Sequence, residues 1–172
     1  TGLSDIMIGK GVTEIGDYAF SGILAEKIVI PSNVTKIGSY AFRNTTAMSF
    51  VLSNGITEAG DHLFFGNENA TIYIEGAVAG DGWSEKWNSL FRPVVYGCTL
   101  SEDKSYVVSV TVTDKTFANT LAEGGIKAPL RDGYEFVGWS YSENGEAEIS
   151  AEKLSEVRPG RTVYAIWRAN AA

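Results

Sequence analysis

Short alternations of apolar and polar residues recur along the first half of the chain. The segment Gly11-Val-Thr-Glu-Ile-Gly-Asp-Tyr-Ala-Phe20 returns at residues 33–42 and, with more changes, at residues 55–64. The offset is 22 residues both times. A fixed period of this length is typical of a solenoid, in which every repeat forms one coil and contacts only its neighbours.

An apolar alternation precedes each copy and predicts a short strand with one buried face. Stacked coils set equivalent residues in columns, so we expect parallel strands spaced ~4.8 Å apart. Two columns are predicted to face the coil interior, namely Ile6, Ile28, Phe50, Ile72 and then Ile8, Ile30, Leu52, Ile74. The opposite side of each coil is expected to be filled by Phe20, Phe42 and Phe64.

The unit after Ile74 departs from the repeat, as the terminal units of solenoids do. Here Trp83 and Trp87 lie four residues apart, a spacing that one helical turn would bring to a single face. We expect these tryptophans to form a lid over the last coil, and an exposed carbohydrate-stacking platform is the alternative. Residue 1 falls within a lead-in strand, so we expect further repeats before it in the parent protein.

The residues between the inward positions of each lead-in strand form an apolar column that faces away from the coil interior. Its members are Met7, Val29, Val51 and Tyr73. An apolar row of this kind either contacts a partner or is covered by another segment. Two hypotheses follow: a partner-binding strip, with Lys27 and Glu75 near its edges, and packing against a flank of the same chain.

The phrases Val12-Thr-Glu-Ile-Gly-Asp-Tyr-Ala-Phe20 and Ile30-Pro-Ser-Asn-Val-Thr-Lys-Ile-Gly-Ser-Tyr-Ala-Phe42 resemble the BspA-type leucine-rich repeat of bacterial surface proteins. The resemblance covers about residues 3–96 and closes with Pro93-Val-Val-Tyr-Gly97. It implies a secreted or wall-attached protein with an adhesive or host-interacting role. It carries no catalytic residues over to this chain.

The 22-residue period ends near residue 97, and the composition changes there. We expect a solenoid with its cap at 1–97, a linker at 98–103 and a second domain at 104–172. Strands are predicted at 106–113, 134–139 and 162–167, with a short helical turn begun by Ser150.

The second half resembles another repeat, on the phrases Gly133-Tyr-Glu-Phe-Val-Gly-Trp139 and Gly160-Arg-Thr-Val-Tyr-Ala-Ile-Trp167. They are similar to the Listeria–Bacteroides repeat, a β-grasp module of the internalin B-repeat type, over residues 104–168. The resemblance implies a stalk or accessory binding unit on a bacterial surface protein. The expected fold is therefore mainly β, a short parallel solenoid followed by a small β-grasp-like α+β domain.

Charge and composition argue against several classes of partner and of metal site. The 14 Lys and Arg stand against 21 Asp and Glu, a net charge of −7, which disfavours nucleic acids and anionic membranes as partners. No apolar run approaches the ~18 residues of a membrane span. His62 and Cys98 are too few for a typical structural zinc site. We expect His62 to be a repeat residue in the column of Tyr18 and Tyr40, and Cys98 to be a small hydrophobe.

These observations predict a non-catalytic extracellular binding or adhesion module of a bacterial cell-surface protein. It would recognise a host or matrix protein, or a glycan, through the strand face of the solenoid. A structural spacer that presents other domains is the alternative. We expect no catalytic residues, no cofactor and no metal, and we interpret the acidic residues between 143 and 156 as solvated surface.

Overall fold

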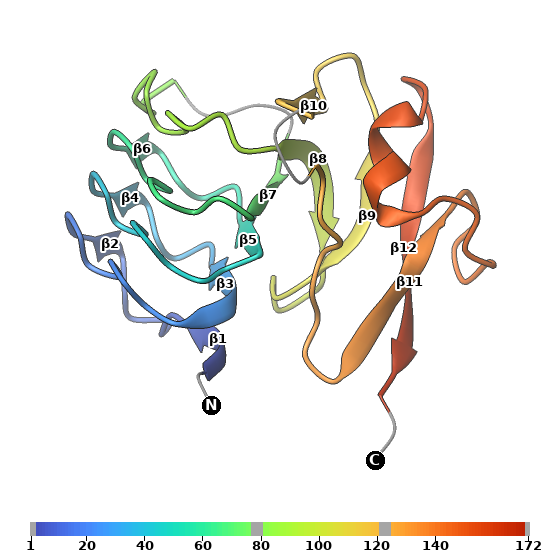
Figure 1. The fold of residues 1–172 in the computed structure, drawn as a ribbon, viewed down its shortest axis with the longest axis horizontal. Helices are drawn as coiled ribbons and strands as arrows, with labels where there is room; N and C mark the ends of the chain where they lie inside the picture. The colour runs from blue at the N-terminus through green and yellow to red at the C-terminus, as the bar shows by residue number, and fades with distance from the viewer. Residues whose placement is uncertain (1–2, 77–80, 121–124, 171–172) are drawn as a thin grey trace.

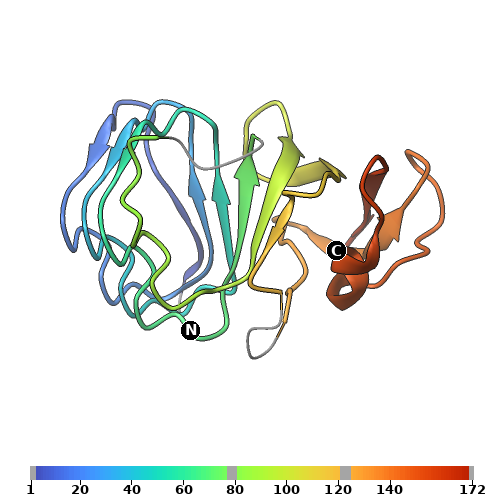
Figure 2. The same cartoon turned by 90° about the horizontal axis from the view of Figure 1, so that it is seen from above.

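The computed structural model describes residues 3–76, 81–120 and 125–170, with the backbone alone for residues 3–7. The first half is a stack of coils, seen from two directions in Figures 1 and 2. Its main parallel ladder consists of β1 (Leu3–Met7), β3 (Ala25–Ile30), β5 (Ser49–Leu52) and β7 (Thr71–Glu75). The other side of the coils carries a smaller parallel sheet of β2 (Glu14–Ile15), β4 (Lys36–Ile37) and β6 (Glu58–Ala59).

Residues 22 apart pair with one another along the ladder. Ile28 pairs with Ile6 in the coil before it and with Phe50 in the coil after it, and Phe50 pairs in turn with Ile72. The side chains of Ile28, Phe50 and Ile72 are completely buried. Each coil therefore buries its apolar residues against its neighbours, and the predicted parallel solenoid is confirmed.

A phenylalanine column fills the side of the coils opposite the ladder, as expected. The ring centroids of Phe20 and Phe42 lie 5.5 Å apart, and those of Phe42 and Phe64 lie 6.1 Å apart. The coils approach closely next to this column. A Cβ added at Gly38 would lie 2.5 Å from the backbone nitrogen of Asp17 in the preceding coil, so the stacking requires glycine there.

The ladder continues for one strand more than the sequence analysis predicted. β8 (Val94–Leu100) pairs in parallel with β7, and Val94 lies 22 residues after its partner Ile72. The strand then leaves the coil at Gly97, which has a φ of +76° and whose Cβ would lie 2.6 Å from the carbonyl oxygen of Thr111. Beyond this point β8 pairs antiparallel with β9 (Val107–Thr111), so one sheet passes from the solenoid into the second half.

The second half contains the strands that the alternation predicts. β9, β11 (Tyr134–Ser140) and β12 (Thr162–Ala169) confirm the three expected strands, and a 3-10 helix at Ala151–Glu156 confirms the helical turn. A short strand that was not expected, β10 (Phe117–Ala118), pairs with β8. The sheet runs in the order β1-β3-β5-β7-β8-β9-β12-β11. The β-grasp assignment of this half stays a prediction.

The expected linker at 98–103 is a strand followed by a closed turn. Residues 98–100 belong to β8, and the turn closes around the carboxylate of Asp103. This carboxylate accepts hydrogen bonds from the hydroxyls of Ser105 (2.6 Å) and Ser101 (2.7 Å). These hydrogen bonds lower the pKa of Asp103 to about 2, and the bond from Ser105 has the larger effect. Serine and aspartate are common both in linkers and in tight turns. Composition alone therefore could not distinguish a linker from a turn at these residues.

The phenylalanine column provides a test of the coil stacking. Truncating Phe42 to alanine should lower the free energy of unfolding by ~3–5 kcal/mol, because a fully buried ring would leave a cavity between two coils. Urea denaturation followed by circular dichroism measures this loss. Phe20→Ala, at a half-buried position in the first coil, is the matched control and should cost less. Equal losses would contradict the shared interior.

The turn around Asp103 predicts a pH dependence. Its pKa is lower in the folded chain than the ordinary value of 3.8, so the carboxylate stabilises the fold above about pH 4. That stabilisation is lost as the pH falls toward about 2. The unfolding midpoint of Asp103→Asn should therefore fall less between neutral and acidic pH than that of the parent. Asp114→Asn, at an exposed turn residue, should keep the parental pH profile.

Candidate binding site

Two members of the apolar outward column, Val51 and Tyr73, are covered by the second half of the same chain. Val51 and Tyr73 are completely buried, and Val29 is half-buried. The residues that form one core cluster with Val51 and Tyr73 include Val95, Val107, Val110, Trp139, Leu154 and Val163. Met7 lies in β1, but its side chain is outside the described residues. Packing within the chain therefore holds for Val51 and Tyr73, and no open binding strip exists at these two positions.

The segment before β11 contacts the ladder directly. The hydroxyl of Tyr73 donates a hydrogen bond to the carbonyl oxygen of Lys127. The backbone nitrogen of Lys127 in turn donates to Oγ1 of Thr71 at 2.8 Å. Burial raises the pKa of the Tyr73 phenol well above its ordinary value. The outer face of β7 is thus sealed by apolar packing and by two hydrogen bonds.

Both charged residues expected at the edges of the strip pair within the chain. The ammonium group of Lys27, only 3% exposed, lies 3.4 Å from the Asp132 carboxylate. Glu75 lies 2.7 Å from the ammonium group of Lys104, in the turn after β8. These pairs connect the second half to β3 and β7 of the ladder.

The two tryptophans lie on the last coil, where the lid was expected. Their ring centroids are 5.0 Å apart in an edge-to-face arrangement, and both side chains are half-buried against the solenoid core. The Trp83 indole donates a hydrogen bond of 3.0 Å to the carbonyl oxygen of Ile56, and Trp87 lies edge-on to Phe64. The segment forms turns, not the helical turn that the four-residue spacing indicated.

Three equivalent residues form an aromatic column along one edge of the solenoid. The rings of Tyr18 and Tyr40 stack at 5.0 Å, and the ring of His62 lies 5.0 Å from that of Tyr40. All three residues have left-handed backbones, with φ of 59°, 58° and 56°. Nδ1 of His62 is 2.6 Å from the hydroxyl of Ser89. His62 is therefore a repeat residue, as predicted, and Tyr18 is 52% exposed at the end of the column.

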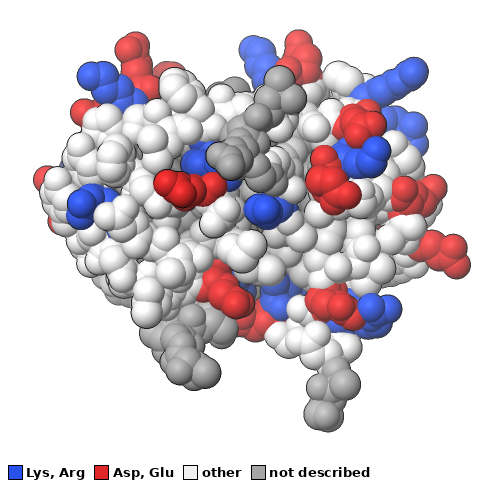
Figure 3. Space-filling model, viewed as in Figure 1, with Lys and Arg blue, Asp and Glu red and all other residues white. Residues whose placement is uncertain are grey.

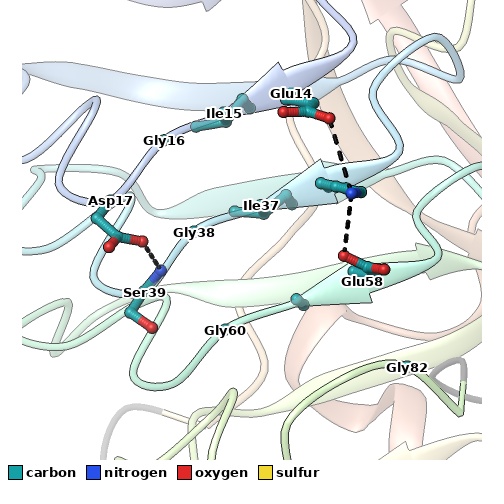
Figure 4. Close-up of a pocket in the computed structure, with 12 residues that line it drawn as sticks. Glu14, Ile15, Gly16, Asp17, Ile37, Gly38, Ser39, Glu58, Gly60 and Gly82 are labelled. Carbon is teal, nitrogen blue, oxygen red and sulfur yellow. Dashed lines mark hydrogen bonds and ion pairs between the residues drawn. The ribbon is translucent and has the colours of Figure 1, made fainter.

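The solvent-facing side of the solenoid is the small sheet of β2, β4 and β6. This sheet forms the bottom of a shallow groove of about 700 Å³, which we name the trough. Figure 4 shows a glycine row along the trough, with Asp17 and Ser39 on one side of the row and Glu14 and Glu58 on the other. The residues that line it include Glu14, Gly16, Asp17, Lys36, Gly38, Ser39, Glu58 and Gly60.

The charges of the trough follow the coil period. The ammonium group of Lys36 lies 3.8 Å from the carboxylate of Glu14 and 3.5 Å from that of Glu58, in the coils on either side. On the other side of the glycine row, Asp17 accepts a hydrogen bond of 2.8 Å from the backbone nitrogen of Ser39. Three carboxylates and one ammonium group give a local charge of 1 − 3 = −2. This surface was not predicted from the sequence, although Glu-Ile-Gly, Lys-Ile-Gly and Glu-Ala-Gly recur at the repeat spacing.

Other chemistry is sparse in the described part of the chain. It holds no group of three or more His, Cys, Asp or Glu side chains placed to share a metal ion. Cys98 is buried, and burial raises the pKa of its thiol. None of the described helices is long and apolar enough to span a membrane. On the face drawn in Figure 3, acidic and basic side chains are interspersed among uncharged ones.

Comparison with known families agrees with the repeat. The family model described as "BspA type Leucine rich repeat region (6 copies)" matches residues 1–79, which contain the coils from β1 to β7. No curated protein and no solved structure matches the chain. The first half is thus similar to BspA-type leucine-rich repeats. The resemblance of the second half to the Listeria–Bacteroides module stays a prediction.

The covered column makes Val51 a sensitive position. Val51→Glu should destabilise the fold by roughly 3–4 kcal/mol at neutral pH, because burial raises the pKa of the carboxyl and the folded chain must take up a proton to bury it. Val29→Glu, at the half-buried equivalent position, should cost clearly less because its carboxylate can reach water. Thermal and urea unfolding of both variants measures the difference. Two mild, equal effects would mean that the second half does not cover β5.

Proposed function

We propose that this chain is a non-catalytic binding segment of a bacterial cell-surface or secreted protein, and that it recognises a protein or glycan partner. The observation that carries the proposal is the solenoid whose coils match the BspA-type repeat over residues 1–79. Repeat solenoids of this kind are typically binding scaffolds, because successive coils present an extended surface of equivalent side chains. The extracellular location and the adhesive role rest on the family resemblance.

The trough and the aromatic column support the proposal better than the strand face does. Val51 and Tyr73 on the strand face are buried under the second half, whereas the trough faces solvent. Tyr18 is 52% exposed, and Phe65, which contacts the edge of Tyr40, is 40% exposed. Large exposed aromatic side chains are typical of recognition surfaces because they bury much area with few rotatable bonds.

The arrangement of the trough supports binding over catalysis. Its carboxylates are spaced by the coil period and lie along an open groove. A catalytic site would bring titratable groups together around one point, with a base within hydrogen-bond reach of a nucleophile. The single histidine, His62, instead contacts Tyr40 and Ser89 in the aromatic column.

A structural spacer is the second candidate, and the continuous sheet favours it. One sheet passes through both halves, and residues of the ladder and of the second half share a core. Such a unit resists bending between its halves and could hold another domain away from a cell wall. A spacer has no saturable partner, which separates it from a binder.

A binding array tests the proposal. The labelled chain is applied to immobilised extracellular-matrix proteins and glycans, with an excess of unlabelled chain as competitor. We expect saturable binding to at least one immobilised partner, and the unlabelled chain should remove it. The Phe42→Ala variant, assayed above its own unfolding temperature, is the control for binding by unfolded chain. A lack of competable signal across the array would favour the spacer.

A further inference from the structure

We propose that the trough docks a lysine- and arginine-rich segment of a protein partner. The inference rests on the proposed function and defines the partner's chemistry. The surface concerned is the face of β2, β4 and β6, which lines a groove of about 700 Å³. Its lining residues carry a charge of 1 − 3 = −2. Charge complementarity therefore selects a cationic partner and repels an anionic one.

Lys36 shows how the trough accommodates a cation. Its ammonium group sits between carboxylates from the two neighbouring coils, 3.8 Å from Glu14 and 3.5 Å from Glu58 (Figure 4). All three side chains are about half exposed or more, so these ion pairs contribute little to stability. A lysine or arginine of a partner can therefore join or replace Lys36 without disturbing the coil.

The side of the glycine row opposite Glu14 and Glu58 carries a further acceptor, Asp17, which does not pair with Lys36. Asp17 holds the backbone nitrogen of Ser39 with one carboxylate oxygen, Oδ1, at 2.8 Å. A carboxylate has about four acceptor positions, so Asp17 keeps capacity for a further donor. Carboxylates thus flank both sides of the glycine row, as Figure 4 shows. A bound segment with cationic groups on both sides would match this arrangement.

The aromatic column adjoins the trough along the chain and favours the same partner. Tyr18 directly follows Asp17, and Tyr40 directly follows Ser39. Tyrosine rings attract ammonium and guanidinium groups, and they cover the apolar stems of lysine and arginine. An uncharged glycan could stack on tyrosine, but it would desolvate the trough carboxylates without providing an opposite charge. A basic protein segment satisfies both features.

The test uses the full chain and a fluorescent lysine-rich peptide, with fluorescence anisotropy at low ionic strength. Glu14→Gln/Glu58→Gln should weaken peptide binding by about three- to tenfold. Lys36→Gln removes the resident cation and should strengthen binding by about two- to threefold. Tyr18→Asn should weaken binding by about two- to fivefold, and asparagine tolerates the left-handed backbone at this position. Thermal unfolding checks that each variant is folded.

A matched control separates the trough from general acidity. Glu143→Gln/Glu146→Gln removes two negative charges, as Glu14→Gln/Glu58→Gln does, but at exposed positions of the second half. Its affinity for the peptide should stay within about twofold of the parent's, because salt screens charges that are far from the trough. Equal weakening by this control, or an absence of peptide binding, overturns the inference. So does displacement of the peptide by a linear uncharged oligosaccharide in a salt-independent manner.

The same variants distinguish failure of this inference from failure of the proposed function. Any partner found in the binding array is measured against Glu14→Gln/Glu58→Gln and against increasing salt. Loss of binding in both measurements supports docking at the trough. A partner whose binding is unaffected by the variant and by salt overturns the basic-segment inference and leaves the binding function intact. An array without any competable partner overturns the binding function itself.

Discussion

In-register parallel pairing between successive coils is the interaction on which the rest of the structure depends. A single coil cannot bury Ile28 or Phe50 by itself, because the surfaces that cover these side chains belong to the coils before and after it. Each fully buried side chain of this size contributes about 1.5–3 kcal/mol of transfer free energy. The pairing also aligns all the remaining positions of the repeat. The inward, outward and trough-lining residues therefore all form columns.

The second half is built on one of these columns. Val51, Tyr73 and Val95 face out of the solenoid, and they form part of the core under β9, β11 and β12. A module of this size has little apolar surface to bury alone, so a ladder that supplies a prepared apolar face stabilises it. The consequence for function is that Val51 and Tyr73 on the strand face cannot contact a partner.

Packing does not fix the charged residues of the trough, and their chemistry can vary for that reason. The glycines beside β4 and β6 are required by the close approach of neighbouring coils. The charged residues at Glu14, Lys36 and Glu58 extend into solvent from strands of two residues, and no core contact fixes their identity. The alternation of charge along this column can therefore change while the coil stays the same.

The sequence by itself determined the coil, because a 22-residue period fixes which residues meet and pairing between neighbours requires no further information. It also determined β9, β11 and β12 of the second half, and the place of Trp83 and Trp87 against the last coil. Only the tertiary structure decided what covers the outward column, since Tyr73 meets Lys127 across 54 residues with no repeating signal. An apolar residue on an outer face has the same pattern whether a partner or its own chain will bury it.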